Sequence, residues 1–244
     1  MKKKEKKSSV TKSGLVKGAF IATIGIVLTK ILGIIYVIPF HAVIGDRGGA
    51  LYGYAYTIYL LFMSLSSAGI PLAISKIVSE YQTLGYYNAK RRAFVIGKKI
   101  ALLLGFVSFL LLLLFAPWIA HAVLGDLSGG NTISDVTLVI RVVASALLFV
   151  PVLSIYRGYF EGHRFMEYPS FSQVLEQLVR VLIIILGSFL ALKVFDLSIT
   201  TAVGIAAFGA TAGAIASYLY LVYKKKQNNS KFNEKIRPVN EPII

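Results

Sequence analysis

Residues 172–187 read SQVLEQLVRVLIIILG, a stretch that is polar in its first half and apolar in its second. Its four long polar side chains are spaced i, i+3, i+4 and i+7, so they share one face of a helix. They are Gln173, Glu176, Gln177 and Arg180. A charge at membrane depth costs about 2.5 to 3.5 kcal/mol on insertion scales, so such a face normally turns toward protein or a watery cavity.

Two interpretations of this polar stripe stay open. In the first, Glu176 and Arg180 form a buried ion pair that fixes how neighbouring helices align. In the second, the stripe lines a hydrophilic cavity in which Arg180 and Lys30 offer positive charge to an anionic substrate. Glu176 then positions these groups or carries a coupling ion or proton. We favour the second interpretation, because pairing lowers the cost of the charges without explaining why they are there.

The rest of the chain places the stripe in a membrane. The 244 residues are 56% hydrophobic and 15% charged, with a mean hydropathy of +0.71, whereas soluble domains are about a quarter charged. The apolar residues cluster in runs of about 20, the length that crosses a hydrocarbon core roughly 30 Å thick. We therefore predict an all-α, multi-pass cell-membrane protein. Its six spans lie at about 14–40, 51–74, 98–120, 134–157, 169–192 and 199–223, flanked by a basic tail at 1–13 and a polar tail at 224–244.

The net charge of +15 follows from this topology. Most of the Lys and Arg residues fall in the two tails, between spans two and three, or between spans four and five, where Arg157 is placed. These segments all lie on one side, and cytoplasmic loops are enriched in Lys and Arg. Both termini are therefore predicted to be cytoplasmic. The charge is attracted to anionic membrane lipids rather than to nucleic acid.

Other features predict packing and moving parts. The small residues Ala22, Gly25, Thr29 and Gly33, and the pair Gly209 and Gly213, predict close helix contacts. Gly69, Pro71 and Pro151 predict breaks or kinks, since proline removes a backbone hydrogen bond. Residues 44–56 are predicted to be a glycine-containing loop followed by interfacial aromatics, and residues 86–99 a basic interfacial helix or loop.

Three further charged residues each have two open interpretations. Lys76 lies four residues before Glu80, which predicts either a helical surface ion pair or a cytoplasmic gate residue. Gly69, Pro71 and Pro151 are the other gate or hinge candidates. Arg141 in span four either lines the cavity or extends outward to the membrane surface.

Enzymatic chemistry is not predicted. The chain has no cysteine and no HExxH pattern, and its three histidines are at predicted loop ends. No metal site and no cofactor are therefore expected.

Three blocks of sequence resemble one known superfamily. They are KGAFIATIGIVLTKILGIIYVIPF (17–40), LYGYAYTIYLLFMSLSSAGIPLAISKIVSEY (51–81) and YRGYFEGHRFMEYPSFSQVLEQLVRV (156–181). They resemble the MOP flippase superfamily, in particular the polysaccharide-biosynthesis branch that includes stage V sporulation protein B and is related to the MurJ lipid II flippases. The resemblance covers residues 14–225 in the right order.

This resemblance implies a MATE-like fold of two six-helix lobes that rock around a central cavity. The implied substrate is an anionic, pyrophosphate-bearing, lipid-linked glycan. In the lipid II flippases a segment similar to TKILG (29–33) contributes a cavity arginine, and Lys30 occupies that place. Tyr36 stands about where a second cavity arginine is found, so the resemblance leaves the identity of the glycan open.

Length is the main departure from the superfamily, whose members carry at least twelve spans. Six spans make one lobe, and the segment after Lys226 resembles an inter-lobe linker. A truncated product, a fragment and a half-transporter that pairs with a second lobe remain open. The alternative functions are a cation-coupled drug exporter of the MATE type and a non-transporting scaffold.

Overall fold

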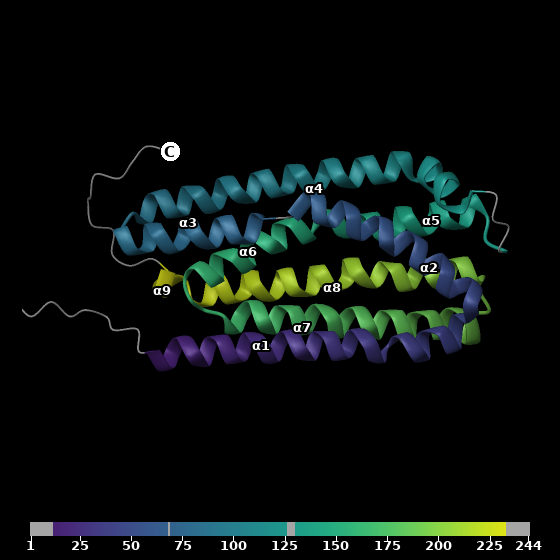
Figure 1. The fold of residues 1–244 in the computed structure, drawn as a ribbon, viewed down its shortest axis with the longest axis horizontal. Coiled ribbons are helices and arrows are strands. Elements are labelled where there is room, and N and C mark those ends of the chain that lie inside the picture. Colours follow the sequence, from purple (N-terminus) through teal and green to yellow (C-terminus); the bar gives the residue numbers. More distant parts are fainter. Residues whose placement is uncertain (1–11, 68, 126–129, 233–244) are drawn as a thin grey trace, which may run out of the picture.

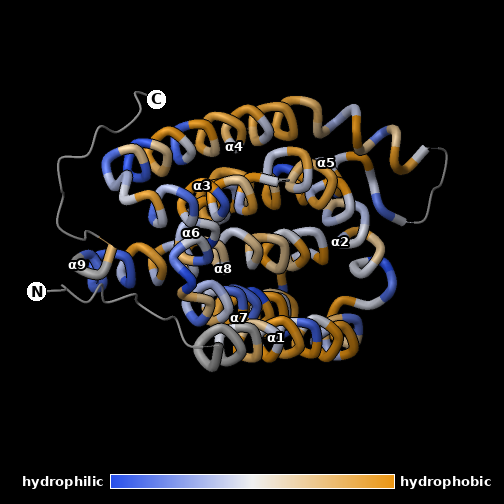
Figure 2. Tube along the Cα trace, turned by 60° about the vertical axis from the view of Figure 1, so that its left-hand side comes forward, coloured by the Kyte–Doolittle hydropathy of each residue, from blue (hydrophilic) through white to orange (hydrophobic). Residues whose placement is uncertain are grey.

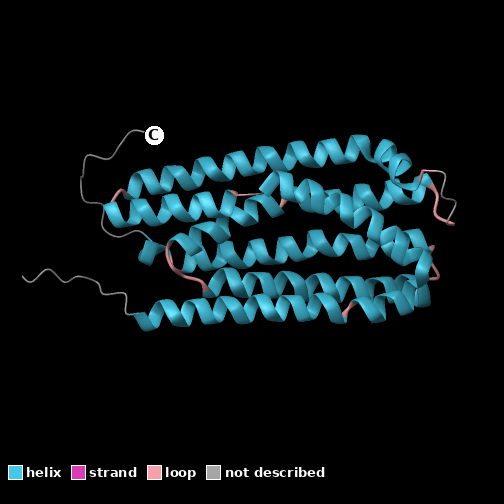
Figure 3. Cartoon of the chain, in the orientation of Figure 1, coloured by secondary structure: helices cyan, strands magenta, loops and turns pink. Residues whose placement is uncertain are grey.

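The computed structural model describes residues 12–67, 69–125 and 130–232, and these form helices with no strand among them (Figure 3). Four segments lie outside this description: residues 1–11 of the predicted basic tail, residue 68, residues 126–129, and residues 233–244 of the predicted polar tail. The helices are α1 (Lys12–Ile35), α2 (Val37–Ser67), α3 (Ile70–Leu84), α4 (Tyr87–Leu124), α5 (Ile133–Ala144), the 3-10 turn η1 (Ser145–Leu148), α6 (Val150–Gly162), α7 (Glu167–Leu182), the π turns η2 (Ile183–Gly187) and η3 (Leu190–Val194), α8 (Ile199–Gln227) and α9 (Asn229–Phe232).

The helices run back and forth along one axis (Figure 1). α1 and the first turns of α2 run in one direction, the rest of α2 and α3 return, and α4 runs forward again. α5, η1 and α6 then form a second returning pass, followed by α7 forward and α8 back. The start of α1 and the end of α8 therefore lie at the same end of the bundle.

Five helical stretches within the described residues are long and apolar enough to cross a membrane. They are Phe20–Leu84, Tyr87–Leu124, Ile133–Gly162, Glu167–Val194 and Ile199–Gln227. The first has 65 residues, which at about 1.5 Å per residue is roughly three times the hydrocarbon thickness. Figure 1 shows why it is so long: the chain doubles back within the first part of α2, where Gly45 departs from helical geometry. The all-α membrane fold predicted from the sequence is confirmed.

The connection between the first two passes differs from the prediction. Residues 44–56 were expected to begin with a loop, but α2 starts at Val37 and continues to Ser67. Its only non-helical residue is Gly45, with φ 67° and ψ −178°. Glycine adopts positive φ without a steric penalty, so one residue turns the chain while its neighbours stay helical. Residues 87–99 likewise belong to α4 rather than to a separate interfacial segment.

The predicted breaks are present. α2 ends at Ser67 and α3 begins at Ile70, with Gly69 in the left-handed region at φ 74°. Pro71 lies in the first turn of α3 and Pro151 in the first turn of α6. At such positions the missing proline N–H leaves no helical hydrogen bond unmade. The role of these breaks as gates or hinges stays a prediction.

Small residues bring α3 and α6 into backbone contact. A Cβ atom placed on Gly158 would lie 2.3 Å from the carbonyl oxygen of Pro71. One turn later, a Cβ atom on Gly162 would lie 2.7 Å from the carbonyl oxygen of Ser75. Helices in lipid associate through this kind of close approach, because apolar surfaces gain little by leaving an apolar solvent.

A buried lysine holds the short helix α9, which follows the last long helix, against the bundle. Lys90 on α4 is only 2% exposed, and its Nζ donates to Gln82 Oε1 at 2.5 Å, His163 Nε2 at 3.1 Å and the Phe232 carbonyl oxygen at 3.0 Å. His163 Nδ1 donates to the Tyr159 carbonyl oxygen, which leaves Nε2 free to accept from Lys90. Burial, with the nearby positive charge of Lys90 added to it, lowers the pKa of His163 to about 4.

Gly158→Ala is expected to lower the free energy of unfolding by about 1–3 kcal/mol, the usual cost of overpacking. The added methyl group meets backbone, which cannot swing away as a side chain can. The measurement is the apparent melting temperature of the purified protein in detergent. Gly53→Ala is the matched control, because a Cβ atom there meets nothing within 4 Å. Equal melting temperatures for the two variants would contradict the close α3–α6 contact.

The lowered His163 pKa predicts a loss of stability in acid. The pKa of His163 is about 4 in the folded protein and 6.5 when the ring is unperturbed. As the pH falls, His163 therefore takes up a proton in the unfolded chain before it does so in the folded protein. The stabilisation from the neutral ring is complete above pH 6.5 and is lost as the pH falls toward 4. His163→Phe should flatten the decline in melting temperature between pH 7 and pH 4.5, whereas replacement of the exposed His121 should not. Parallel pH profiles for all three proteins would contradict this assignment.

Candidate functional site

The polar stripe of α7 contributes to a cluster in which one carboxylate bridges two arginines. Arg157 Nη2 on α6 lies 2.7 Å from Glu176 Oε2, and Arg180 Nη2 lies 2.8 Å from Glu176 Oε1. The three side chains are 13–17% exposed. Each carboxylate oxygen therefore has its own guanidinium partner, and the Arg157–Glu176–Arg180 cluster carries a net charge of +1.

Neutral groups fix the orientation of both arginines. Arg157 Nε donates to Ser172 Oγ at 3.0 Å, and Arg180 Nη1 donates to the hydroxyl oxygen of Tyr56 on α2 at 3.0 Å. The cluster thus joins three helices that are far apart in the sequence: α2, α6 and α7. A planar guanidinium held at two edges keeps a defined direction for its charge.

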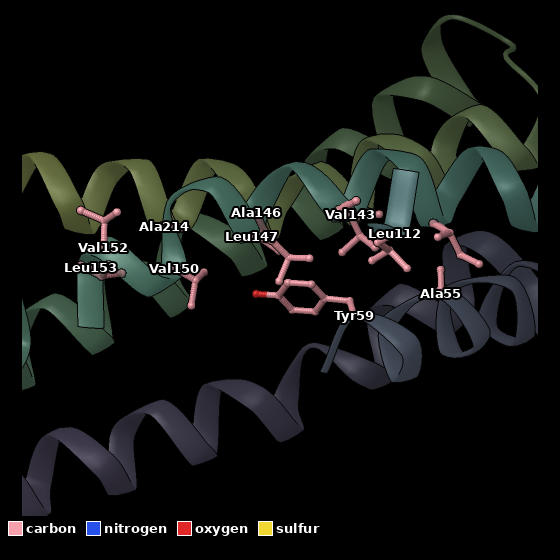
Figure 4. Close-up of a cluster of buried hydrophobic side chains, with 14 of the residues drawn as sticks. Ala55, Tyr59, Leu112, Val143, Ala146, Leu147, Val150, Val152, Leu153 and Ala214 are labelled. Carbon is pink, nitrogen blue, oxygen red and sulfur yellow. The ribbon is translucent and has the colours of Figure 1, made fainter. Parts of the chain in front are cut away.

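Tyrosines of α2 extend the cluster. The rings of Tyr52 and Tyr56 stack with centroids 5.4 Å apart, and Tyr59 follows at 5.5 Å from Tyr56. Figure 4 shows the Tyr59 ring between α2 and the η1 region, near Leu147. Within the described chain, the Tyr59 hydroxyl and Arg180 Nε are buried without a hydrogen-bond partner. Such groups are rare in folded proteins, so the cluster retains hydrogen-bonding capacity that a ligand or water can use.

The glycine pair of α8 allows α7 to lie close enough for this arrangement. A Cβ atom on Gly213 would lie 2.6 Å from the Glu176 carbonyl oxygen, and one on Gly209 would lie 3.0 Å from the Arg180 carbonyl oxygen. One turn further along α8, Ser217 Oγ donates to the Ser172 carbonyl oxygen at 2.6 Å. The predicted close packing of Gly209 and Gly213 is confirmed, and it occurs directly behind the charged residues.

The small-residue face of α1 packs on the other side of α7. A Cβ atom on Gly25 would lie 3.0 Å from Ser170 Cβ, and one on Gly33 would lie 3.5 Å from Gln177 Nε2. Gln177 is only 8% exposed. It therefore faces α1 rather than the Arg157–Glu176–Arg180 cluster. Lys30 lies beside this contact face and is exposed.

The remaining predicted site residues lie elsewhere. Gln173 is half-buried on α7, one turn before Gln177. Arg141 is exposed on α5, and its Nε donates to the Leu113 carbonyl oxygen of α4 at 3.3 Å. Of the predicted cavity residues, the structure brings Glu176 and Arg180 into the cluster and leaves Lys30 and Arg141 outside it.

The polar face of α3 lines a separate groove of about 720 Å³. Lys76 and Glu80 are both exposed along it, and among the described residues they form no ion pair with each other. The surface ion pair that their spacing allowed is therefore not formed.

Sequence reasoning missed Arg157 and Tyr56. Span four was predicted to end at residue 157, which placed Arg157 in a cytoplasmic loop. However, α6 continues to Gly162, so the side chain lies within the helical bundle. Tyr56 was assigned to interfacial aromatics, but it lies in the middle of α2. Arg157 lies in the YRGYF block, which contributes to the resemblance to the superfamily. Its place in that block was the sequence feature that could have indicated a functional role.

No metal centre forms within the part of the chain that the structure describes, where no three His, Cys, Asp or Glu side chains gather to hold an ion. The Arg157–Glu176–Arg180 cluster itself presents arginine and tyrosine hydrogen-bond donors around one carboxylate. Arginine and tyrosine donors of this kind bind oxyanions such as phosphate.

Comparisons with known proteins give a consistent result. A family model described as "Polysaccharide biosynthesis protein" matches residues 15–240. The chain is 40% identical over 220 residues to "Lipid II flippase MurJ" of Bacillus subtilis, covering 89% of this chain and 40% of that protein. It is 30% identical over 220 residues to "Stage V sporulation protein B" of the same organism, covering 88% and 40%. The chain thus spans about 40% of the length of these curated relatives.

Solved structures match in fold. A MATE protein in its bent conformation aligns with a TM-score of 0.71 at 16% identity, over 93% of this chain and 49% of that one. An inward-facing multidrug resistance MATE transporter of the MOP superfamily aligns with a TM-score of 0.69 at 16% identity, over 83% and 46%. In both alignments the chain corresponds to about half of the solved protein.

Glu176→Gln is expected to destabilise the protein by about 3–5 kcal/mol, because it leaves two largely buried arginines without their counter-charge. Arg157→Gln should cost less, since Arg180 still pairs with the carboxylate. The measurement is thermal unfolding in detergent, with the exposed Glu80→Gln as the matched control. If Glu176→Gln and Glu80→Gln unfold at the same temperature, the carboxylate does not hold the cluster together.

Proposed function

Since the chain belongs to the polysaccharide biosynthesis protein family, we propose that it forms the N-terminal half of a flippase for a lipid-linked glycan precursor. The net positive Arg157–Glu176–Arg180 cluster within the helical bundle carries this proposal. A lipid-linked precursor bears a pyrophosphate, and guanidinium groups bind phosphate oxygens in a bidentate manner. One of the named relatives is a lipid II flippase.

The proposed role of Glu176 is to position charge. With one carboxylate between them, the two arginines stay in place without a bound anion, and the net charge remains +1. A substrate phosphate competes with the carboxylate for the same guanidinium donors. Binding is therefore strong enough to attract the headgroup and weak enough to release it, as transport requires.

The proposed topology has six crossings, with both ends in the cytoplasm. The back-and-forth passes of Figure 1 support six crossings, because the 65-residue apolar stretch comprises an outward and a returning pass. The concentration of Lys and Arg in the tails supports the orientation.

A second six-helix lobe is the proposed partner. In transporters with repeated halves, the substrate site lies at the interface between the repeats. The MATE alignments, which cover about half of each solved chain, support a complementary half. The breaks at Gly69–Pro71 and at Pro151, and the polar α3 groove that contains Lys76, are the proposed moving parts at the cytoplasmic side.

A cation-coupled drug exporter is the second candidate, and the MATE-like fold favours it. Such a site needs a carboxylate available to a cationic drug. Glu176 is bridged by two arginines, so it offers the opposite charge. We therefore rank export of cations below flipping of an anionic lipid, and a non-transporting scaffold below both.

Arg180→Ala is expected to reduce precursor translocation by at least about tenfold, the effect of removing one charge-assisted contact. The measurement is the appearance of precursor on the outer face of cells that express the chain with a complementary lobe and lack other flippases. The matched control is Lys193→Ala, which removes an exposed cation in η3, outside the cluster. Unchanged translocation in Arg180→Ala would refute the proposed role of the cluster. Increased sensitivity to cationic drugs in Glu176→Gln, with translocation intact, would favour the exporter.

A further inference from the structure

We propose that the N-terminal part of α4 binds the headgroup of an anionic phospholipid, at a site separate from the Arg157–Glu176–Arg180 cluster. A hollow of about 330 Å³ opens there. It is lined by Asn88, Arg91, Arg92, Val95 and Ile96. Their spacing places them along one face of the helix, with the polar residues first and the apolar residues one turn later.

The two arginines of this hollow are available to a ligand. Arg91 and Arg92 are exposed. Within the described residues, neither forms an ion pair, since the ion pairs found there involve Arg47, Arg157 and Arg180. Adjacent guanidinium groups without carboxylate partners provide donors in the forked geometry that suits phosphate.

Other cations converge on the same end of α4. The charges of Lys98 and Arg91 both act on Lys225 of α8, and Lys225 Nζ lies 4.3 Å from the centroid of the Phe94 ring. Like charges from two helices are thus gathered in one region, and no carboxylate of the described chain is ion-paired with any of them. A bound anion removes this repulsion.

The apolar half of the hollow indicates a lipid rather than a free phosphate. Val95 and Ile96 are 41% and 43% exposed, and the same helix continues with exposed Leu102, Leu103 and Phe106. Figure 2 shows α4 hydrophilic at its beginning and hydrophobic along most of its remaining length. A phosphate held by Arg91 and Arg92 therefore has its acyl chains directed along an apolar helix surface. The proposed site lies at the end of the bundle where α1 starts and α8 ends, which is also where anionic lipids attract basic residues.

The test is native mass spectrometry of the purified full chain, released from detergent micelles. In separate samples the micelles contain phosphatidylglycerol or phosphatidylcholine, or the buffer contains inorganic phosphate. Wild-type protein is expected to retain phosphatidylglycerol preferentially. Arg91→Gln and Arg92→Gln should each weaken retention about fivefold, the factor expected for one basic residue at an anionic membrane surface. The double variant should lose most bound lipid, and Lys193→Gln should retain it.

Three results of this experiment would overturn the proposal. They are equal retention of phosphatidylcholine and phosphatidylglycerol, unchanged retention in the double variant, and displacement of the lipid by inorganic phosphate at equal concentration. Because both arginines are exposed, the double variant should unfold at the wild-type temperature in phosphatidylcholine. A second variant, Val95→Ser with Ile96→Ser, keeps the charge and removes the apolar surface. It should also weaken phosphatidylglycerol binding, and undiminished binding would exclude a lipid site.

Discussion

The carboxylate of Glu176, placed between two guanidinium groups inside a largely apolar bundle, constrains the helices around it. Arg157 comes from α6 and Arg180 from α7, and Tyr56 of α2 holds the far edge of Arg180. Removing any one charge would leave another partly desolvated, and an unpaired charge in such surroundings is costly. The ion pairs and the Tyr56 hydrogen bond therefore hold α2, α6 and α7 in register at this level, and the rest of the bundle must be compatible with that register.

Small residues make that arrangement possible. Gly209 and Gly213 place the backbone of α8 against the carbonyl groups of Arg180 and Glu176, and Gly158 allows α3 to approach α6. In a membrane, apolar side chains gain little by leaving lipid for protein, so helix association depends on close van der Waals contact and on polar groups. Here both contributions occur at the same level of α7. The charged residues and the glycines behind them are best understood as one structural unit.

The charge of the cluster relates this packing to function. Two arginines against one glutamate leave a positive site with unused donors at Arg180 Nε and the Tyr59 hydroxyl. Such a site suits a phosphate-bearing ligand and disfavours a cation, although the fold resembles that of multidrug transporters. The buried Lys90 contributes differently, because it fixes the chain segment that leaves α8. The position of α9 against the bundle is thereby set by hydrogen bonds.

The sequence by itself determined the membrane class, the all-α fold, the shared face of Glu176 and Arg180, the breaks at Gly69 and Pro151, and the close-packing role of Gly209 and Gly213. All of these follow from composition or from periodicity along one helix. Only the tertiary structure decided that Arg157 belongs to the cluster, that Gln177 faces α1, and that Lys30 and Arg141 lie apart from it. The physical reason is that helix periodicity fixes which residues share a face, whereas the partner of that face depends on how helices distant in sequence pack together.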